Sequence, residues 1–479
     1  MTLRTAALLV ILIALTTALF PTTPAYDLVI LNGRVIDPET KSDAVRNLGI
    51  TNGKIRAITD RRLNGNTVID ARGLVVSPGF IDLHQHGQNE ENYRFKALDG
   101  VTTALELEVG TGDVDRWYAE REGKSLINFG VSAGHLAARM AAMKEPVTFL
   151  PTGEAARRAA TEAEIADMKQ RIEQGLKRGA LAVGFGIQYT PNASNWEILE
   201  LFRVAARFNA SCHVHMRSAG AKDPAGSIQA LEEVISAAAI TGAPLHVVHI
   251  HSTGGPATPK LLQMIGEARR RELDITTECY PYIAGMTDIK SAIFNEGWQE
   301  VFGIDYKDLQ WAATGERLTK ETFEQYRKTG GMVAVFSMTE EIVREALRNP
   351  LTIIASDGIL DNGKGHPRTA GTYSRVLGKY VREDGTLTLT DALAKMTLMP
   401  AKRLETRAPV MKSKGRIRVG ADADLAIFDA RSIADRATFQ EPAQAATGMR
   451  FVIVSGVVIV KDGQVQQNVH PGGPIRAPF

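Results

Sequence analysis

The sequence predicts an α/β protein: a (β/α)8 TIM-type barrel joined to a small β-sandwich domain that is built from both ends of the chain. Three observations favour this fold. The chain has 479 residues, which is more than one ordinary domain needs. Short apolar runs alternate with amphipathic helical patterns through the middle of the sequence. Near both ends the pattern changes to strand-like runs with Gly, Asn and Asp turns.

The β-sandwich domain is expected over residues 26–77 and 408–479. Its strands are expected within Tyr26–Val35, Leu48–Ile58, Val68–Val76, Gly415–Asp429 and Phe451–Gly463. These runs share apolar β-branched residues and short turns, which is typical of small antiparallel sheets. Because the same pattern occurs at both ends of the chain, we expect the two segments to assemble into one domain.

The barrel is expected over residues 78–407. Eight apolar runs are the candidate strands: Val101–Val109, Ile127–Val131, Ala180–Gly186, Ala210–Met216, Pro244–Ile250, Asp274–Cys279, Gly331–Phe336 and Leu351–Ser356. Six amphipathic segments are candidate helices: Thr161–Lys177, Trp196–Phe208, Ile228–Thr241, Pro259–Arg271, Glu340–Arg348 and Leu389–Met396. A doubly wound open sheet is the alternative, but the number of units favours a closed barrel. Residues 284–329 interrupt the alternation and carry several aromatic residues, which fits either a lid over the barrel mouth or an ordinary surface insertion.

The first 25 residues read as a secretory signal peptide. Arg4 supplies a positive charge, Ala6–Phe20 is mostly apolar, and Thr23–Ala25 is a small-residue cleavage region. The apolar run is shorter than the ~20 residues that span a bilayer, which argues against a permanent anchor. We therefore expect a secreted protein, periplasmic if the source is Gram-negative, with an uncleaved N-terminal anchor as the alternative.

Composition excludes several classes of protein. Lys plus Arg (56) and Asp plus Glu (54) nearly balance, for a net charge of +2, and no basic run is present. No nucleic-acid partner and no stable membrane anchor are therefore expected. With 2 cysteines, the chain cannot build a disulfide framework or a zinc site of several thiolates.

Six of the 10 histidines form three His-x-His pairs at the ends of predicted strands. Active sites of such barrels form at this end of the strands. His84 and His86 follow the apolar run Gly79–Leu83 and share a face of the strand with Asp82. His213 and His215 form the second pair. His249 and His251 form the third, while His246 takes the opposite face and reads as a packed structural histidine.

Two acidic residues lie within the strand VTTALELEVG. Glu106 and Glu108 share one face, and a buried carboxylate is costly unless a cation pairs with it. Glu108 is nearer the strand end and is the better metal ligand, whereas Glu106 fits a salt bridge inside the barrel. Asp357 follows the apolar run LTIIAS and precedes Gly358, as suits a general base beside a metal ion. His, Glu and Asp ligands without thiolate indicate Zn²⁺, with one or two ions. Such an ion activates water, so amide hydrolysis is the expected reaction.

From about Tyr26 to the C-terminus, the chain resembles the amidohydrolase superfamily and, within it, the D-aminoacylases (N-acyl-D-amino-acid deacylases). The resemblance is carried by SPGFIDLHQH, GVTTALELEVG, HVHMRS, VVHIHSTG, ECYPYIAG, SDGILDNGKGHPRTAGTYSRVLGKYVRE and GRIRVGADADLAIFD. It implies a zinc-dependent hydrolase that cleaves N-acyl-D-amino acids, small-molecule substrates, into a carboxylate and a free D-amino acid. ALELEVG is most similar to the D-glutamate deacylases.

The resemblance also implies roles for individual residues. His84 and His86 match one pair of metal ligands, His215 and His249 match the second pair, and Asp357 matches the catalytic aspartate. Arg368 and Tyr282 fall at the positions where family members bind the substrate's α-carboxylate. Tyr189 falls at a position that lines the substrate pocket.

Three positions depart from the family pattern. No cysteine follows GVTT, where family members usually have a metal-ligating one, and Glu108 takes that role here, with one-residue uncertainty in the alignment. His251 replaces a family lysine, so it holds substrate only when protonated or donating a hydrogen bond. Met286 stands where relatives usually have Ser. For an acidic substrate side chain, Lys290 is the candidate cation and Lys260 the second.

Two other functions fit parts of the sequence. A cyclic-amide hydrolase of the dihydropyrimidinase or hydantoinase type would use the same metal ligands, although the HPRxxGTY block speaks against it. A non-catalytic periplasmic binding protein on a degenerate barrel is the third candidate, against which the four ligand histidines and Asp357 argue.

Overall fold

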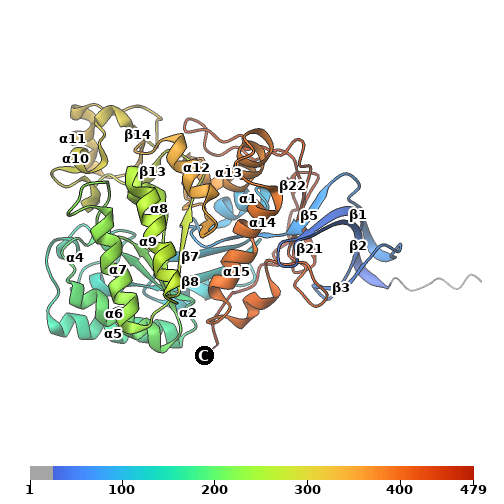
Figure 1. Cartoon of the computed structure of the whole chain (residues 1–479), viewed down its shortest axis with the longest axis horizontal. Helices are drawn as coiled ribbons and strands as arrows, with labels where there is room; N and C mark the ends of the chain where they lie inside the picture. Colours follow the sequence, from blue (N-terminus) through green and yellow to red (C-terminus); the bar gives the residue numbers. More distant parts are fainter. Residues whose placement is uncertain (1–24, 479) are drawn as a thin grey trace, which may run out of the picture.

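The computed structural model describes residues 25–478 of the chain. The predicted signal peptide lies almost wholly outside the described residues. In the described part, no helix is long and apolar enough to cross a membrane. Figure 1 shows the chain as a barrel surrounded by helices, with a β domain to one side.

Eight parallel strands form the barrel sheet in the order β16-β12-β11-β10-β9-β8-β7-β6. Their bounds are β6 (Phe80–Asp82), β7 (Val101–Thr111), β8 (Asn128–Gly134), β9 (Ala182–Gly186), β10 (Ser211–His215), β11 (Leu245–Val247), β12 (Ile275–Cys279) and β16 (Thr352–Ile354). The ring closes beyond the ends of β6 and β16. There the Asp357 amide donates to the His84 carbonyl at 2.7 Å, and the His86 amide donates to the Gly358 carbonyl at 2.9 Å. The predicted fold class is thus confirmed, and the closing hydrogen bonds join two predicted site segments.

One predicted barrel strand is wrong. Gly331–Phe336 contains β15 (Met332–Val335), which pairs with β13 (Gly285–Asp288) and β14 (Leu309–Trp311) in a separate three-stranded sheet. The eighth barrel strand is β6 instead. An apolar run of four residues fits either sheet equally well, because burial rather than barrel membership produces the pattern.

Helices cover the outside of the barrel. They are α1 (Glu90–Leu98), α2 (Val114–Ala119), α3 (His135–Ala142), α4 (Glu154–Arg157), α5 (Glu162–Lys177), α6 (Asn195–Arg207), α7 (Ser227–Thr241), α8 (Ile250–Gly254), α9 (Thr258–Arg270), α12 (Glu340–Arg348), α13 (Arg368–Arg375), α14 (Leu389–Met396) and α15 (Leu398–Leu404). All six predicted helices are present within one residue at each end. Helix α5 starts with a capping box between Thr161 and Glu164, which satisfies two amides that the first turn leaves unpaired.

The β domain is one nine-stranded sheet. Its strands are β1 (Tyr26–Asp37), β2 (Ser42–Thr51), β3 (Lys54–Thr59), β4 (Gly65–Asp70), β5 (Val75–Pro78), β19 (Leu425–Phe428), β20 (Met449–Val454), β21 (Val457–Lys461) and β22 (Gln464–Val465). The two ends of the chain meet where β5 pairs antiparallel with β19. A separate apolar cluster that includes Ile30, Ile50, Leu425 and Ile453 fills this domain.

Residues 285–335 form a small unit with its own core. The three-stranded sheet carries α10 (Trp298–Phe302) and α11 (Lys320–Thr329), and Trp298 stacks on Phe323 with ring centroids 5.4 Å apart. In Figure 1 this unit lies above the ends of α7–α9. Because Met286, Ile293, Phe302 and Val335 also line the cavity of the barrel, the unit covers the barrel mouth.

A buried carboxylate ties the β domain to the barrel. Asp424 accepts hydrogen bonds from Lys414 Nζ at 2.6 Å, from Asn128 on β8 at 3.0 Å and from the Ser455 amide at 2.7 Å. Both members of the ion pair have side chains at most 5% exposed. Removing one partner leaves the other charge buried and uncompensated.

We therefore predict that Asp424→Ala lowers the free energy of unfolding by about 3–5 kcal/mol, measured by urea denaturation. Asp43→Ala is the matched control. It breaks the ion pair with Arg34, whose side chains are 34% and 50% exposed, and should cost at most about 1 kcal/mol. Equal losses in the two variants would contradict the role given to Asp424.

Candidate metal centre

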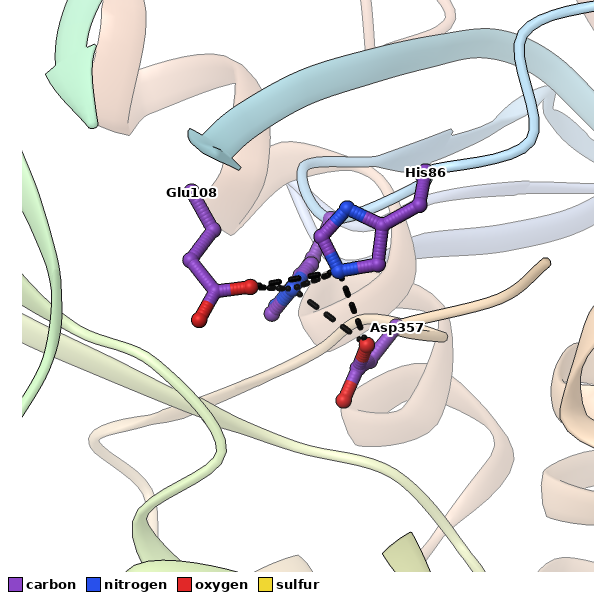
Figure 2. Close-up of side chains that lie close together, drawn as sticks. His86, Glu108 and Asp357 are labelled. Carbon is purple, nitrogen blue, oxygen red and sulfur yellow. Dashed lines mark hydrogen bonds and ion pairs between the residues drawn. The ribbon is translucent and has the colours of Figure 1, made fainter. Parts of the chain in front are cut away.

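Strand ends from opposite sides of the barrel bring the predicted ligands together. The ligands form two groups, and within each group the ligand atoms lie within 4.8 Å of one another. The first group is His84, His86, Glu108 and Asp357, and the second is Glu108, His215 and His249. Figure 2 shows the side chains of His86, Glu108 and Asp357 pointing toward one another. Glu108 belongs to both groups and uses a different oxygen for each.

The first group is already close to the shape of a tetrahedral zinc site. His84 Nε2 lies 2.8 Å from Glu108 Oε2, 3.2 Å from His86 Nε2 and 3.5 Å from Asp357 Oδ1. His86 Nε2 lies 3.2 Å from Glu108 Oε2 and 3.1 Å from Asp357 Oδ1. Four ligands bound to zinc at about 2.0–2.1 Å would be about 3.3–3.4 Å apart. These residues therefore fit a divalent ion without rearrangement of the backbone.

The second group has three ligands and is less regular. Glu108 Oε1 lies 2.7 Å from His215 Nδ1 and 3.8 Å from His249 Nε2. His215 is the last residue of β10, whereas β11 ends at Val247, two residues before His249. The predicted alternation of faces along 246–251 is thus wrong beyond Val247. His249 has φ +29° and starts the turn into α8.

A polar partner fixes the tautomer of each ligand histidine. Glu278 Oε1 accepts from His84 Nδ1 at 2.5 Å, and Glu106 Oε2 accepts from His86 Nδ1 at 2.7 Å. In the second group, Gln188 Oε1 accepts from His215 Nε2 at 2.6 Å, and Ser252 Oγ lies 3.1 Å from His249 Nδ1. Each ring then turns its other nitrogen toward Glu108.

Asp357 is held from both sides. Ser356 donates its amide and hydroxyl to the buried Asp82 carboxylate, at 3.0 and 2.6 Å, and Lys96 pairs with Asp82 at 2.9 Å. Asp357 itself has φ +52°, a left-handed backbone conformation that is uncommon outside glycine. Arg368 Nη2 contacts Asp357 Oδ2 at 2.9 Å. The other oxygen, Oδ1, is the one that faces the histidines.

Electrostatics keep the carboxylates ionised. Burial would raise the pKa of Asp357, but the Arg368 guanidinium and His84 hold that pKa below its usual range. Burial likewise opposes ionisation of Glu108 and Glu278, yet His84 and the other histidines that contact them lower the pKa of both. Burial would lower the pKa of His84 and His86, but the surrounding carboxylates raise both well above the ordinary value. The pKa of His215 is lowered, mainly by burial and then by His249.

A cavity opens over the metal centre. The predicted Tyr189 lines it and packs edge-on against His215, with ring centroids 4.9 Å apart. Arg368 also lines it, is 1% exposed, and has Nε and Nη1 without a hydrogen-bond partner among the described residues. Apolar side chains make up most of the remaining wall: Val109, Phe149, Leu150, Met286, Ile293, Phe302, Met332, Val335 and Ile359.

Four predicted substrate residues lie away from this cavity wall. Tyr282 is buried, and its hydroxyl lies 3.4 Å from the Pro367 carbonyl. His251 is fully buried against Tyr280, with ring centroids 4.3 Å apart, and burial lowers its pKa to about 3. His251 is therefore neutral and cannot offer a positive charge to a substrate. Lys290 and Lys260 are both exposed, on the insertion unit and on α9.

Sequence reasoning missed Glu278, Tyr280 and the hydrogen bond between Glu106 and the ligand His86. The salt bridge that the sequence suggested for Glu106 inside the barrel is made with His86. Glu278 lies on the inward face of β12, where it bonds both His84 and His246, the latter at 2.9 Å. An acidic residue inside an apolar strand, the signal that identified Glu108, is present in ITTEC too. Tyr280 lines the cavity, and the Arg368 guanidinium lies 4.6 Å from the centre of its ring.

The geometry defines a barrel hydrolase with a metal centre, and comparison with known proteins agrees. The amidohydrolase family profile matches residues 67–460. A D-aminoacylase from Alcaligenes xylosoxydans xylosoxydans is 30% identical, over 91% of this chain and 94% of that protein. An N-acyl-D-glutamate deacylase from the same organism is 29% identical, over 94% and 96%.

A solved structure agrees with these relatives. It is an N-acyl-D-glutamate deacylase from Bordetella bronchiseptica, complexed with zinc and a phosphonate mimic of the reaction's tetrahedral intermediate. It superposes with a TM-score of 0.81 at 27% identity, over 94% of this chain and 100% of that one. The chain belongs to the amidohydrolase family, in its D-aminoacylase branch.

The loop that leads into α13 and Arg368 depends on a neutral histidine. His366 donates from Nε2 to the Ala284 carbonyl at 2.9 Å and accepts at Nδ1 from the Arg368 amide at 3.0 Å. Burial, followed by the Arg368 charge, places its pKa well below the ordinary value. Between the ordinary pKa and this lowered one, the unfolded chain binds a proton that the folded chain does not.

We predict that His366 makes the protein less stable as pH falls below about 6.5. His366→Gln keeps an acceptor and removes the titration. It should reduce the pH dependence of the unfolding free energy between pH 6.5 and 5.5 by up to about 1.4 kcal/mol per pH unit. Urea titrations of both proteins at fixed zinc concentration measure this, and identical slopes would contradict it.

Proposed function

We propose that the protein is a metal-dependent hydrolase that cleaves the amide bond of N-acyl-D-amino acids, releasing a carboxylate and a free D-amino acid. One observation carries the proposal: Glu108 lies between two sets of ligand atoms, and Asp357 and Arg368 stand beside them at the cavity. The deacylase names of the relatives, and the zinc and phosphonate in the Bordetella structure, support the same chemistry.

His84, His86, Glu108 and Asp357 would hold one zinc ion, and Glu108, His215 and His249 a second. A zinc ion in such a site lowers the pKa of water toward neutrality and polarises an amide carbonyl. The protein's own contribution is to keep the carboxylates ionised and to fix the directions of the ligands before substrate arrives.

Asp357 is the proposed general base. Its carboxylate is ionised, faces the ligand cluster through Oδ1, and is oriented by Arg368 and by the Ser356–Asp82 hydrogen bonds. It accepts a proton from the attacking water and then donates that proton to the leaving amine nitrogen. The amine needs this proton, because an amide nitrogen leaves poorly as an anion.

Arg368 is the proposed anchor for the substrate's α-carboxylate. Its guanidinium is buried at the cavity wall, and two of its nitrogens, Nε and Nη1, have no hydrogen-bond partner among residues 25–478. A buried donor without a partner is costly, and a substrate carboxylate would be a charged acceptor for such a donor. Tyr280 supports the guanidinium from one face.

The cavity favours an apolar substrate side chain over an acidic one. Arg368 is the one Lys or Arg among the residues that line the cavity in the described chain, and the α-carboxylate already requires it. Lys290, the cation that the sequence suggested for a second carboxylate, is exposed on the insertion unit. Met286, Ile293 and Met332 line the wall instead.

We also propose that the chain is exported. Support comes from its N-terminal sequence alone: a charged start, an apolar run and a small-residue cleavage region within residues 1–25. The cleaved protein would act outside the cytoplasm, in the periplasm if the source is Gram-negative.

Asp357→Asn should reduce kcat at least about 10³-fold, because the amide side chain cannot accept the water proton. Folding should survive, since Asn can still accept from Arg368. Steady-state assays at saturating zinc measure the effect, with bound metal counted in parallel. A variant with near-normal kcat would exclude Asp357 as the base.

A chiral panel of N-acetyl amino acids tests the substrate. We expect D-enantiomers to be hydrolysed, with kcat/KM for N-acetyl-D-leucine at least about tenfold above that for N-acetyl-D-glutamate, because the apolar wall offers no partner for a second carboxylate. The opposite order would contradict the apolar pocket. Turnover of hydantoin or dihydrouracil without activity on the panel would contradict the proposed function itself.

A further inference from the structure

A loop of the β domain reaches the residues that surround Arg368. It connects β19 to β20 and spans residues 429–448. Backbone hydrogen bonds between Ala434 and Thr447, at 3.1 and 2.9 Å, join its two arms, and Phe439 lies near its tip. Phe439 is half-buried, although the residues on either side of it are exposed. The tip of a surface loop thus directs an aromatic side chain inward.

The Phe439 ring lies where three parts of the molecule meet. Its centroid is 4.6 Å from that of Phe336, which follows β15 of the insertion unit. It is 4.8 Å from the ring of His366 and 6.4 Å from the ring of Tyr282. The Phe439 carbonyl accepts a hydrogen bond at 3.0 Å from the buried Gln310 side chain on β14. The β domain, the insertion unit and the segment that leads into α13 therefore meet at this residue.

We propose that the β19–β20 loop belongs to the substrate-binding machinery and that Phe439 is a positioning residue. It holds His366, and through it Arg368, in the direction in which the guanidinium meets the substrate's α-carboxylate. The inference rests on the proposed function, because it takes Arg368 as the carboxylate anchor. It gives the β domain a part in substrate binding.

The contacts of His366 give the first argument. Its Nε2 donates to the Ala284 carbonyl at 2.9 Å, and its Nδ1 accepts from the Arg368 amide at 3.0 Å. Both hydrogen bonds lie near the plane of the imidazole, so the ring can still tilt about the line that joins them. Tyr282 and Phe439 pack edge-to-face against the ring, with centroids 5.2 and 4.8 Å away, and restrict that tilt. Loss of the Phe439 ring therefore loosens the acceptor that holds the Arg368 backbone.

The packing of the loop against α13 gives the second argument. Asp435 Oδ2 lies 3.0 Å from Arg375 Nη1 in the last turn of this helix, which begins at Arg368. Arg375 Nε also donates to the Pro281 carbonyl at 2.8 Å. Gly371, in the middle of α13, permits the close approach, because a Cβ at that position would lie 2.7 Å from the Asp435 Cβ. The loop thus constrains the helix as well as the residues that precede it.

The direction of the guanidinium decides which donors it offers. Arg368 Nη2 is engaged by Asp357 at 2.9 Å, while Nε and Nη1 are buried without a hydrogen-bond partner in the described chain. Tyr280 supports the guanidinium from one face and belongs to a small apolar cluster against which Phe439 packs. A misplacement of about 1 Å, even from a change far from the reacting atoms, can cost about 100-fold.

The first test is steady-state kinetics with N-acetyl-D-leucine at saturating zinc. We expect Phe439→Ala to raise KM about tenfold and to change kcat less than about threefold, because the ring touches no reacting group but orients the anchor. The inhibition constant of D-leucine, which carries the carboxylate, should rise by the same factor. That of D-leucinol, which has the same side chain without a carboxylate, should not change. A merely structural defect would not distinguish the two inhibitors.

Matched variants accompany this test. Phe439→Tyr keeps the ring and should restore KM to within about twofold of the wild-type value. Phe451→Ala is the control, because Phe451 is another half-buried aromatic residue of the β domain and packs against that domain's own apolar cluster. It should leave KM unchanged. If Phe439→Ala does not fold, Phe439→Leu and Asp435→Asn take its place, and each should raise KM about threefold.

The second test is the crystal structure of Phe439→Ala beside that of the wild type. We expect the Arg368 guanidinium to move by about 1 Å or more and the hydrogen bond from His366 to the Ala284 carbonyl to be lost. An unmoved guanidinium would overturn the proposal, as would an unchanged KM, a loss confined to kcat, or equal effects on D-leucine and D-leucinol.

The failure of the proposed function has a different signature. A wild-type protein that hydrolyses no N-acyl-D-amino acid would refute that function. Movement of Arg368 in the Phe439→Ala crystals would still support the link between the β domain and the cavity wall.

Discussion

The Glu108 carboxylate is the interaction on which the site depends. It is 3% exposed, and its two oxygens face different pairs of histidines, 2.8 Å from His84 Nε2 on one side and 2.7 Å from His215 Nδ1 on the other. Such a buried charge is tolerated only when cations or hydrogen-bond donors surround it. The barrel supplies those partners from the segment that follows β6 and from the end of β10. One side chain thus contacts two histidines, His84 and His215, that are 131 positions apart in the sequence (215 − 84).

Closure of the barrel and assembly of the site are the same structural event. The hydrogen bonds that join the ends of β6 and β16 involve the backbone of His84, His86, Asp357 and Gly358. Asp82, the last residue of β6, also links these two strand ends by accepting hydrogen bonds from the amide and hydroxyl of Ser356. The catalytic geometry is therefore set by the rigid part of the fold, while the cavity wall comes partly from the insertion unit, where sequence changes cost the barrel little.

The fold and the ligand set were largely predictable, because both leave local signals. Histidines two residues apart after an apolar run, and acidic residues inside an apolar strand, stand out where burial would otherwise exclude them. Predictions failed where the argument needed distances across the structure. The alternation of side chains along a strand placed His251 on the same face as His249. However, β11 ends at Val247 and helix α8 follows. The family resemblance suggested Tyr282 and Lys290, whereas Tyr280 lines the cavity beside Arg368.

The sequence by itself determined the class of fold and the types of side chain that meet at the strand ends, since residue type, burial and strand-end position are local properties. Tertiary structure alone decided which carboxylates stand behind which histidines and which cation reaches the cavity. These depend on side chains from separate strands approaching within about 3 Å, a scale at which hydrogen bonds form. Pairings on that scale are fixed by how the strands close into a ring.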